Sequence, residues 1–233
     1  MSKEVLLFIV HSSTAISLLP IVIMLWYRKS LLKQSYGIAI LGIYLTFFLS
    51  AIGSYITSYF VESSMPSYHI FIPLRGFFVC LLFVKELENK QFKIAGIVIF
   101  LLILCSEILE LIYFGGIMSN NNLSSLAVNL TFIIFYILYI IDTYKNKPET
   151  MFQTRGIFPV FSVIFGYEVI YFLFTMIEND LREKLLVDQT AVAIWGGFVL
   201  LYIVSLILAS YLLWRNLSAF KKEFMTQNTI IEK

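Results

Sequence analysis

Apolar residues occur along this chain in long runs separated by short polar segments. A helix needs about 20 mostly apolar residues to cross the roughly 30 Å of hydrocarbon in a bilayer, and seven windows of the sequence satisfy this condition. The windows lie at 5–27, 36–60, 68–84, 94–114, 124–144, 157–177 and 190–214. The pattern therefore predicts an all-α, polytopic membrane protein whose seven transmembrane helices form one bundle over residues 1–214.

Positive charges are distributed unevenly among the polar segments. Thirteen of the 17 Lys and Arg residues follow the first, third, fifth or seventh window, whereas the other segments contain only Lys3, Arg182 and Lys184. Because Lys and Arg are retained on the cytoplasmic side of a membrane, the N-terminus is predicted outside and the C-terminus in the cytoplasm. The alternation continues through all seven windows, and one missed or extra span would have disrupted it.

The last polar segment, 215–233, is predicted to be a short cytoplasmic tail. Within it, Leu217, Phe220 and Phe224 recur at helical spacing beside Lys221 and Lys222. An amphipathic helix of this kind lies in the membrane interface, with its apolar face toward the lipid. We therefore expect the tail to lie on the inner membrane surface.

Composition excludes several classes of protein. Hydrophobic residues make up 59% of the chain and charged residues 14%, whereas about a quarter of a soluble domain is charged. No basic patch is available for nucleic acid, and Cys80 and Cys105, which lack the spacing of a metal site, are interpreted as packing residues. The first window is longer than a signal peptide and has no small-residue cleavage motif before Trp26. We expect a multi-pass protein of the cytoplasmic (inner) membrane of a bacterium.

Among the polar side chains inside the windows, six at intermediate depth lie in the predicted outer half. At about 1.5 Å per helical residue, they lie roughly 6 to 14 Å from the outer end of each window. They are His11, Arg75, Glu107, Glu110, Asn129 and Glu168. Such groups are costly in hydrocarbon and are typical of ligand sites, of proton sites or of paired charges.

Arg75 stands in the middle of the run HIFIPLRGFFVC, residues 69–80. An arginine at this depth costs roughly 3 kcal/mol unless it is paired or reaches water. Glu107 and Glu110 are three residues apart and share one helical face, and Glu168 lies at a similar depth. We therefore expect Arg75 to face the bundle interior and to pair with at least one of these carboxylates.

Aromatic residues accompany the polar groups on the last two windows. Tyr167 and Tyr171 lie on adjoining helical turns, and Trp195 and Tyr202 are seven residues apart on one face. Aromatic walls with a few convergent polar groups are typical of a small-ligand site, although a tyrosine stripe is also typical of core packing. The pattern predicts a cavity that opens toward the outside.

Two further patterns concern the packing and shape of the helices. Three serines at spacing four in the second window indicate a close contact between helices; they are Ser50, Ser54 and Ser58. Three prolines are expected to kink their helices; they are Pro20, Pro73 and Pro159.

The candidate ligand-binding residues combine these polar and aromatic groups. They are Arg75, Glu107, Glu110, Glu168, His11, Asn129, Tyr167, Tyr171, Trp195 and Tyr202. No catalytic residue, metal ligand or cofactor is assigned. The two histidines, His11 and His69, lie on different windows, whereas zinc enzymes of the membrane bring several histidines together.

Two runs carry a resemblance to known proteins: GIFPVFSVIFGYEVIYFLFT at 156–175 and GGFVLLYIVSLILASYLLW at 196–214. They are similar to the last two spans of uncharacterised seven-helix bacterial membrane proteins found alongside histidine kinases. The resemblance rests on aromatic and aliphatic texture, so it implies a sensing role but no functional residue. Rhodopsins fit less well, because residues 190–214 lack the lysine that binds retinal.

We expect a receptor or sensor-like protein, not an enzyme, that binds a small polar or anionic ligand, or protons, in an outward-facing pocket inside the membrane. Its expected partners are the lipid bilayer, the small-molecule ligand and a cytoplasmic or membrane signalling protein, and not nucleic acid. The alternative is a small-solute or proton-coupled transporter that uses the same pocket. An intramembrane metal hydrolase is the third hypothesis.

Overall fold

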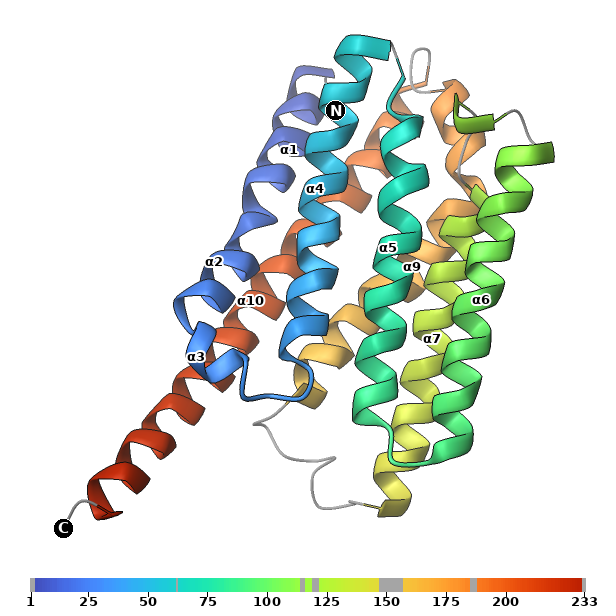
Figure 1. Cartoon of the computed structure of the whole chain (residues 1–233). Helices are drawn as coiled ribbons and strands as arrows, with labels where there is room; N and C mark the ends of the chain where they lie inside the picture. Colours follow the sequence, from blue (N-terminus) through green and yellow to red (C-terminus); the bar gives the residue numbers. More distant parts are fainter. Residues whose placement is uncertain are drawn as a thin grey trace.

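The computed structural model of the chain is a bundle of long helices that run beside one another (Figure 1). It describes residues 3–61, 63–113, 116–118, 122–146, 157–184 and 188–231, which are helical apart from short turns and include no strand. The elements are α1 (Lys3–Ile16), α2 (Leu18–Trp26), α3 (Arg28–Leu31), α4 (Gly37–Val61), α5 (Met65–Glu86), α6 (Lys90–Tyr113), the 3-10 turn η1 (Gly116–Met118), α7 (Asn122–Asn146), α9 (Ile157–Lys184) and α10 (Gln189–Ile231).

The described chain is all-helical, as predicted, and seven of its helical segments are long and apolar enough to cross a membrane, which supports a multi-pass membrane protein. They are Glu4–Trp26, Gly37–Val61, Met65–Glu86, Lys90–Tyr113, Leu123–Asn146, Phe158–Ile177 and Gln189–Ala219. Their bounds lie within a few residues of the predicted windows. The third window, which contains Arg75 and was the shortest, is a complete helix of 22 residues.

The first transmembrane segment is interrupted near Pro20. Helices α1 and α2 are separated at Ser17. Proline has no N–H to donate, and its ring crowds the carbonyl group four residues earlier, which here belongs to Ile16. Pro73 lies inside α5 without ending that helix, and Pro159 lies in the first turn of α9. Of the three prolines, the first therefore has the largest effect on helix continuity.

The helices connect at two ends of the bundle, which we distinguish by the position of the N-terminus. The start of α1 lies at the same end as the starts of α5, α7 and α10 and the ends of α4, α6 and α9 (Figure 1). We call this the N-terminal end. The other end, where α3 lies and α6 and α9 begin, is called the opposite end.

The most aromatic part of the core lies toward the opposite end, around Phe83. The ring of Phe83 lies 5.1 Å from Phe135, 5.5 Å from Phe132 and 5.6 Å from Phe161, measured between ring centroids. These four residues, which we call the phenylalanine cluster, are at most 1% exposed. Because lipid is as apolar as the rings, close packing rather than the hydrophobic effect must stabilise the cluster in a membrane.

At the opposite end, hydrogen bonds connect the short segments between helices to neighbouring helices. The backbone N–H of Glu88 donates to Oδ2 of Asp142 over 2.6 Å, and Asn216 on α10 donates from Nδ2 to the Tyr36 hydroxyl over 3.2 Å. Tyr36 precedes α4 and is buried. Its burial, followed by the negative charge of Glu86, raises the pKa of the Tyr36 hydroxyl above its ordinary value.

The last helix extends well past the rest of the bundle (Figure 1). With 43 residues, α10 is about 65 Å long at 1.5 Å per residue, roughly twice the thickness of the hydrocarbon core. The predicted tail from 215 is helical as far as Ile231, but it continues α10 without a break and is not a separate element. Its position on a membrane surface stays a prediction, and the side chains of Phe220 and Phe224 lie outside the described residues.

Candidate functional site

Arg75 lies inside the bundle, as predicted. Its side chain on α5 is 6% exposed. The guanidinium donates from Nη2 to Oδ1 of Asn129 on α7 over 2.7 Å, and the ring centroid of Phe47 on α4 lies 4.8 Å from Cζ. The second contact is a cation–π interaction, in which the face of a ring attracts a cation. Residues from three helices therefore fix the position of this charge.

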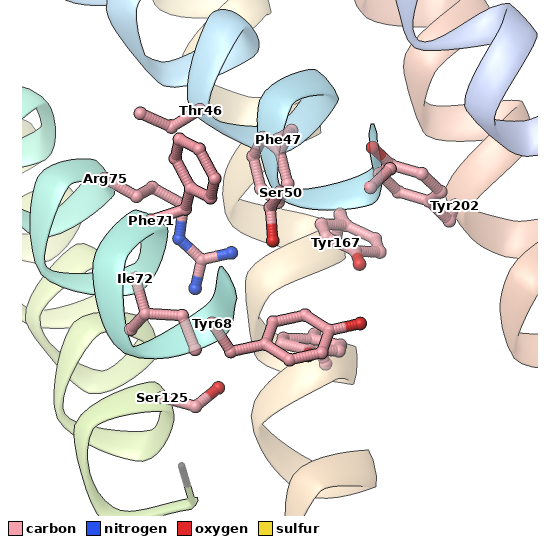
Figure 2. Close-up of a pocket in the computed structure, with 12 residues that line it drawn as sticks. Thr46, Phe47, Ser50, Tyr68, Phe71, Ile72, Arg75, Ser125, Tyr167 and Tyr202 are labelled. Carbon is pink, nitrogen blue, oxygen red and sulfur yellow. The ribbon is translucent and has the colours of Figure 1, made fainter. Parts of the chain in front are cut away.

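The guanidinium points into a cavity of about 170 Å³ (Figure 2). This cavity, which we call the Arg75 cavity, is lined by Thr46, Phe47, Ser50, Ala51, Tyr68, Phe71, Ile72, Arg75, Ser125, Tyr167, Tyr171 and Tyr202. The lining residues come from α4, α5, α7, α9 and α10. Half of them are aromatic, and none of these twelve carries a charge apart from Arg75.

Arg75 was expected to pair with at least one of three carboxylates. Glu168 interacts with it electrostatically, whereas Glu107 and Glu110 contact other groups. Glu107 on α6 accepts a 2.6 Å hydrogen bond from Nδ1 of His69 on α5. Glu110 accepts from the backbone N–H groups of Leu123 and Ser124. Within the described part of the chain, the hydrogen-bond acceptor of Arg75 is an amide and not a carboxylate.

The contacts of Glu110 follow from the position of its side chain at the start of α7. The first N–H groups of a helix have no acceptor within the helix, and the helix dipole favours a negative charge there. Oε1 and Oε2 of Glu110 lie 2.5 Å and 3.0 Å from two such nitrogen atoms. Glu110, which is 3% exposed, thus stabilises the contact between α6 and α7, and its chemistry is accounted for without a ligand.

Three buried polar atoms around Arg75 lack a hydrogen-bond partner within the described residues. They are Nε of Arg75, Nδ2 of Asn129 and Oε2 of Glu168. Glu168 on α9 is 2% exposed and interacts electrostatically with Arg75. Buried polar groups in proteins almost always have a partner, so this cluster of two donors and one acceptor is an unusual feature of the described residues.

The structure divides the ten candidate residues into three groups. Four line the Arg75 cavity: Arg75, Tyr167, Tyr171 and Tyr202. Two lie behind its wall and interact with Arg75: Asn129 and Glu168. Four are not among the lining residues: His11, Glu107, Glu110 and Trp195.

The last group has other surroundings. Nδ1 of His11 lies 2.8 Å from the hydroxyl oxygen of Tyr55, which connects α1 to α4. Trp195 packs edge-on against Phe174, with ring centroids 5.2 Å apart. Sequence spacing placed each of these side chains on a helical face, but it did not show how each helix is rotated toward its neighbours.

Several lining residues were missed in the sequence, although a signal for some of them was present. Tyr68, Phe71 and Ile72 precede Arg75 by seven, four and three residues, which is the spacing of one helical face. A search along the face that carries the arginine would have found them. Ser50, interpreted as part of a helix contact, lines the cavity (Figure 2).

A second, smaller cavity lies on the other side of an aromatic wall. Its volume is about 20 Å³, and its lining is mostly apolar. Phe47, Tyr167 and Tyr202 line both cavities. The Tyr202 ring lies 5.1 Å from Tyr167 and 6.0 Å from Phe47 between centroids, so these three side chains, which we call the aromatic wall, separate the two spaces.

No protein-family model matches the chain, and comparisons with curated proteins and with solved structures find no similar protein. Within the described residues, no group of three or more His, Cys, Asp or Glu side chains is arranged to hold a metal ion. The geometry of the Arg75 cavity is therefore the main basis for a functional assignment.

Proposed function

We propose that this protein is a membrane receptor or sensor-like protein that binds a small anionic ligand in the Arg75 cavity. In this proposal the N-terminus is outside a bacterial cytoplasmic membrane, so the cavity lies in the outer half of the bundle. The bound state is communicated to a cytoplasmic or membrane signalling protein. No catalytic step is required.

One observation carries the proposal: a buried cation faces a cavity that supplies no counter-ion. A charge in a low-dielectric interior is costly unless it is paired. Asn129 offers one neutral acceptor to the guanidinium, which has five N–H donors. None of the residues that line the cavity is acidic. An anion in the cavity would accept hydrogen bonds from the donors of the guanidinium that Asn129 does not use.

The last helix supports a signalling role. Tyr202 on α10 lines the cavity, and the same helix continues without interruption to Ile231, past the end of the bundle (Figure 1). A continuous helix transmits a displacement along its length, as in helix shifts of known switches. A ligand that contacts Tyr202 therefore contacts α10, the helix that extends farthest from the bundle and that a signalling partner could bind.

The experiment that tests the proposal compares anion binding by the wild type and by Arg75→Gln in nanodiscs. Acetate, benzoate, phosphate and sulfate would each be added while the midpoint of thermal unfolding is measured. We expect at least one anion to raise the midpoint of the wild type, because a ligand that binds the folded state stabilises it, and to leave Arg75→Gln unchanged. Leu102→Ala, at a side chain that is 61% exposed, is the matched control and should respond like the wild type.

A response that survives in Arg75→Gln would refute the assignment of Arg75 as the anchor. The absence of any response in the wild type would argue against anion recognition altogether.

A transporter is the second candidate, and the aromatic wall favours it. Two cavities that share Phe47, Tyr167 and Tyr202 could join if these side chains moved, and carriers alternate access in this way around a central site. Uptake of a labelled anion into proteoliposomes separates the two functions. Saturable binding without flux supports the receptor, and flux that depends on Arg75 supports the carrier.

A further inference from the structure

We infer that the ligand of the Arg75 cavity is a small monocarboxylate with a flat, apolar body, such as an aromatic carboxylate. The inference rests on the proposed function and narrows it from anions in general to one chemical class. It is derived from the charge of the cavity, the accessible donors of the guanidinium, and the shape and composition of the walls.

The charge of the cavity favours a single negative charge on the ligand. Arg75 contributes the one positive charge among the twelve lining residues, and Glu168, which lies behind the wall and interacts with Arg75, is acidic. A dianion such as phosphate would keep a second charge without a partner in a poorly solvated space, which is costly. A monoanion adds the smallest negative charge that can still pair with the guanidinium.

The surroundings of Arg75 favour a planar anionic group that approaches its edge. The ring of Phe47 covers a face of the guanidinium at 4.8 Å, and Asn129 occupies one donor of Nη2. The remaining N–H groups lie in the guanidinium plane, and Nε–H has no partner within the described chain. A carboxylate accepts two parallel hydrogen bonds from such an edge.

Hydroxyl groups are available beside the guanidinium to complete the site. Ser50 on α4 and Ser125 on α7 both line the cavity, and Figure 2 shows the oxygen atoms of both on the side toward which Arg75 points. A carboxylate has about four lone-pair sites. It would therefore accept from a serine as well as from Arg75.

The walls favour an apolar and flat body for the rest of the ligand. Six aromatic side chains line the cavity, and the rings of Tyr167 and Tyr171 lie nearly parallel, at 16°. A cavity of about 150 Å³ holds one benzene ring. The Arg75 cavity, at about 170 Å³, thus matches one ring or a short branched chain with its carboxylate, and it is too small for a nucleotide.

Calorimetric titration of the full chain in nanodiscs tests the ligand class. The probes are benzoate, its neutral isostere benzamide, acetate and inorganic phosphate. We expect benzoate to bind at least about tenfold more tightly than each of the other three, because an unpaired buried charge or an unfilled apolar wall costs at least that factor. Arg75→Gln should abolish benzoate binding, which also excludes partition into lipid as the source of heat.

A second variant tests the contribution of the aromatic lining separately from that of the charge. Phe71→Ala removes one ring of the lining and should lower the ratio of benzoate to acetate affinity by about tenfold, since the loss affects only the probe that contains a ring. Thermal unfolding of the variant establishes that it is folded. An unchanged ratio in folded Phe71→Ala would overturn the assignment of an aromatic body.

The possible results distinguish a failure of the proposed ligand class from a failure of the proposed function. Phosphate binding that depends on Arg75, with no binding of benzoate, would overturn the monocarboxylate class and leave anion recognition intact. Binding of benzamide as tight as that of benzoate would refute the role of the charge, and with it both proposals. Benzoate binding that is equal in Arg75→Gln and the wild type would also refute both.

Discussion

Two levels of helix α5, its middle and its last turns, show two different uses of a transmembrane interior. Phe83, near the end of the helix, belongs to a dry cluster of four phenylalanines. Arg75 is eight residues earlier, about 12 Å along the axis, and borders a cavity with unpartnered polar atoms. Packing is closer in the first region than in the second, which is consistent with a stabilising role for the first and with the proposed binding role for the second.

The comparison also shows what stabilises each region. In a membrane, apolar side chains gain little from leaving lipid, so the phenylalanine cluster depends on van der Waals contacts. The Arg75 region instead contains a charge whose burial opposes folding unless it is compensated. Substitutions in the two regions should therefore have opposite effects on the free energy of unfolding.

The largest expected effect is that of Phe83→Ala. The side chain is fully buried and contacts three other rings, so its removal leaves a cavity and should lower the free energy of unfolding by on the order of 3 kcal/mol. Unfolding by denaturant in mixed micelles measures the loss. Anion binding per folded molecule should be retained. A variant as stable as the wild type would show that this cluster is not the stabilising region.

The next largest effect is expected for Arg75→Leu, in the opposite direction. Arg75→Leu removes the cost of burying a charge, and we expect this gain to be at least as large as the cost of leaving Oδ1 of Asn129 without its donor. We expect a stability equal to or above that of the wild type, measured in the same assay, with loss of anion binding. Clear destabilisation would mean that the charge is structural.

A smaller effect is expected at the contact between α6 and α7. Glu110→Gln retains one acceptor but loses the charge that faces the first N–H groups of α7, so the free energy of unfolding should fall by about 1 kcal/mol. Hydrogen exchange of the Leu123 and Ser124 amides should become faster, while that of amides next to Phe135 stays unchanged. Unaltered exchange at the first two amides would contradict the capping role.

The smallest effect is expected at Tyr36, at the opposite end. Burial raises the pKa of its hydroxyl, so the folded state holds this proton more tightly than the unfolded state, where the pKa is about 10. The stabilisation is complete below pH 10 and is lost as the pH rises above that value. Tyr36→Phe should reduce the alkaline loss of stability and remove the bond from Asn216, at a cost of about 1 kcal/mol at neutral pH.

The dependence of unfolding on pH, measured between pH 8 and about pH 11 for both proteins, checks the prediction for Tyr36. Identical slopes above pH 10 would show that this tyrosine does not contribute.

The sequence was sufficient to predict the transmembrane helices, but not which side chains meet in the Arg75 cavity. Seven helices follow from the length of the apolar runs, and the interior position of Arg75 follows from the cost of exposing a guanidinium to lipid. The partners of the polar residues depend on how each helix is rotated and which helices are neighbours. Glu110 therefore binds backbone groups of α7, although its spacing from Glu107 suggested a shared partner.

The serines of α4 illustrate the same limit. Small residues at spacing four allow close approach of helices, and Gly53 on α4 is indeed close to Phe71 and Ser67 of α5. Ser50, one turn earlier, borders the Arg75 cavity instead. One face of α4 thus contacts α5 around Gly53 and lines the Arg75 cavity around Ser50. The spacing of small residues in the sequence does not distinguish a helix contact from a cavity lining.

Because α10 is continuous, a small tilt near the cavity displaces its far end by a larger distance. From Tyr202 in the cavity wall to Ile231, the helix extends about 44 Å at 1.5 Å per residue. A tilt of about 5° around Tyr202 moves the far tip by roughly 4 Å, which is less than the rise of about 5.4 Å of one helical turn. Under the proposed function, a small adjustment beside a bound ligand therefore becomes a larger displacement at the far end of α10, where a signalling partner would bind.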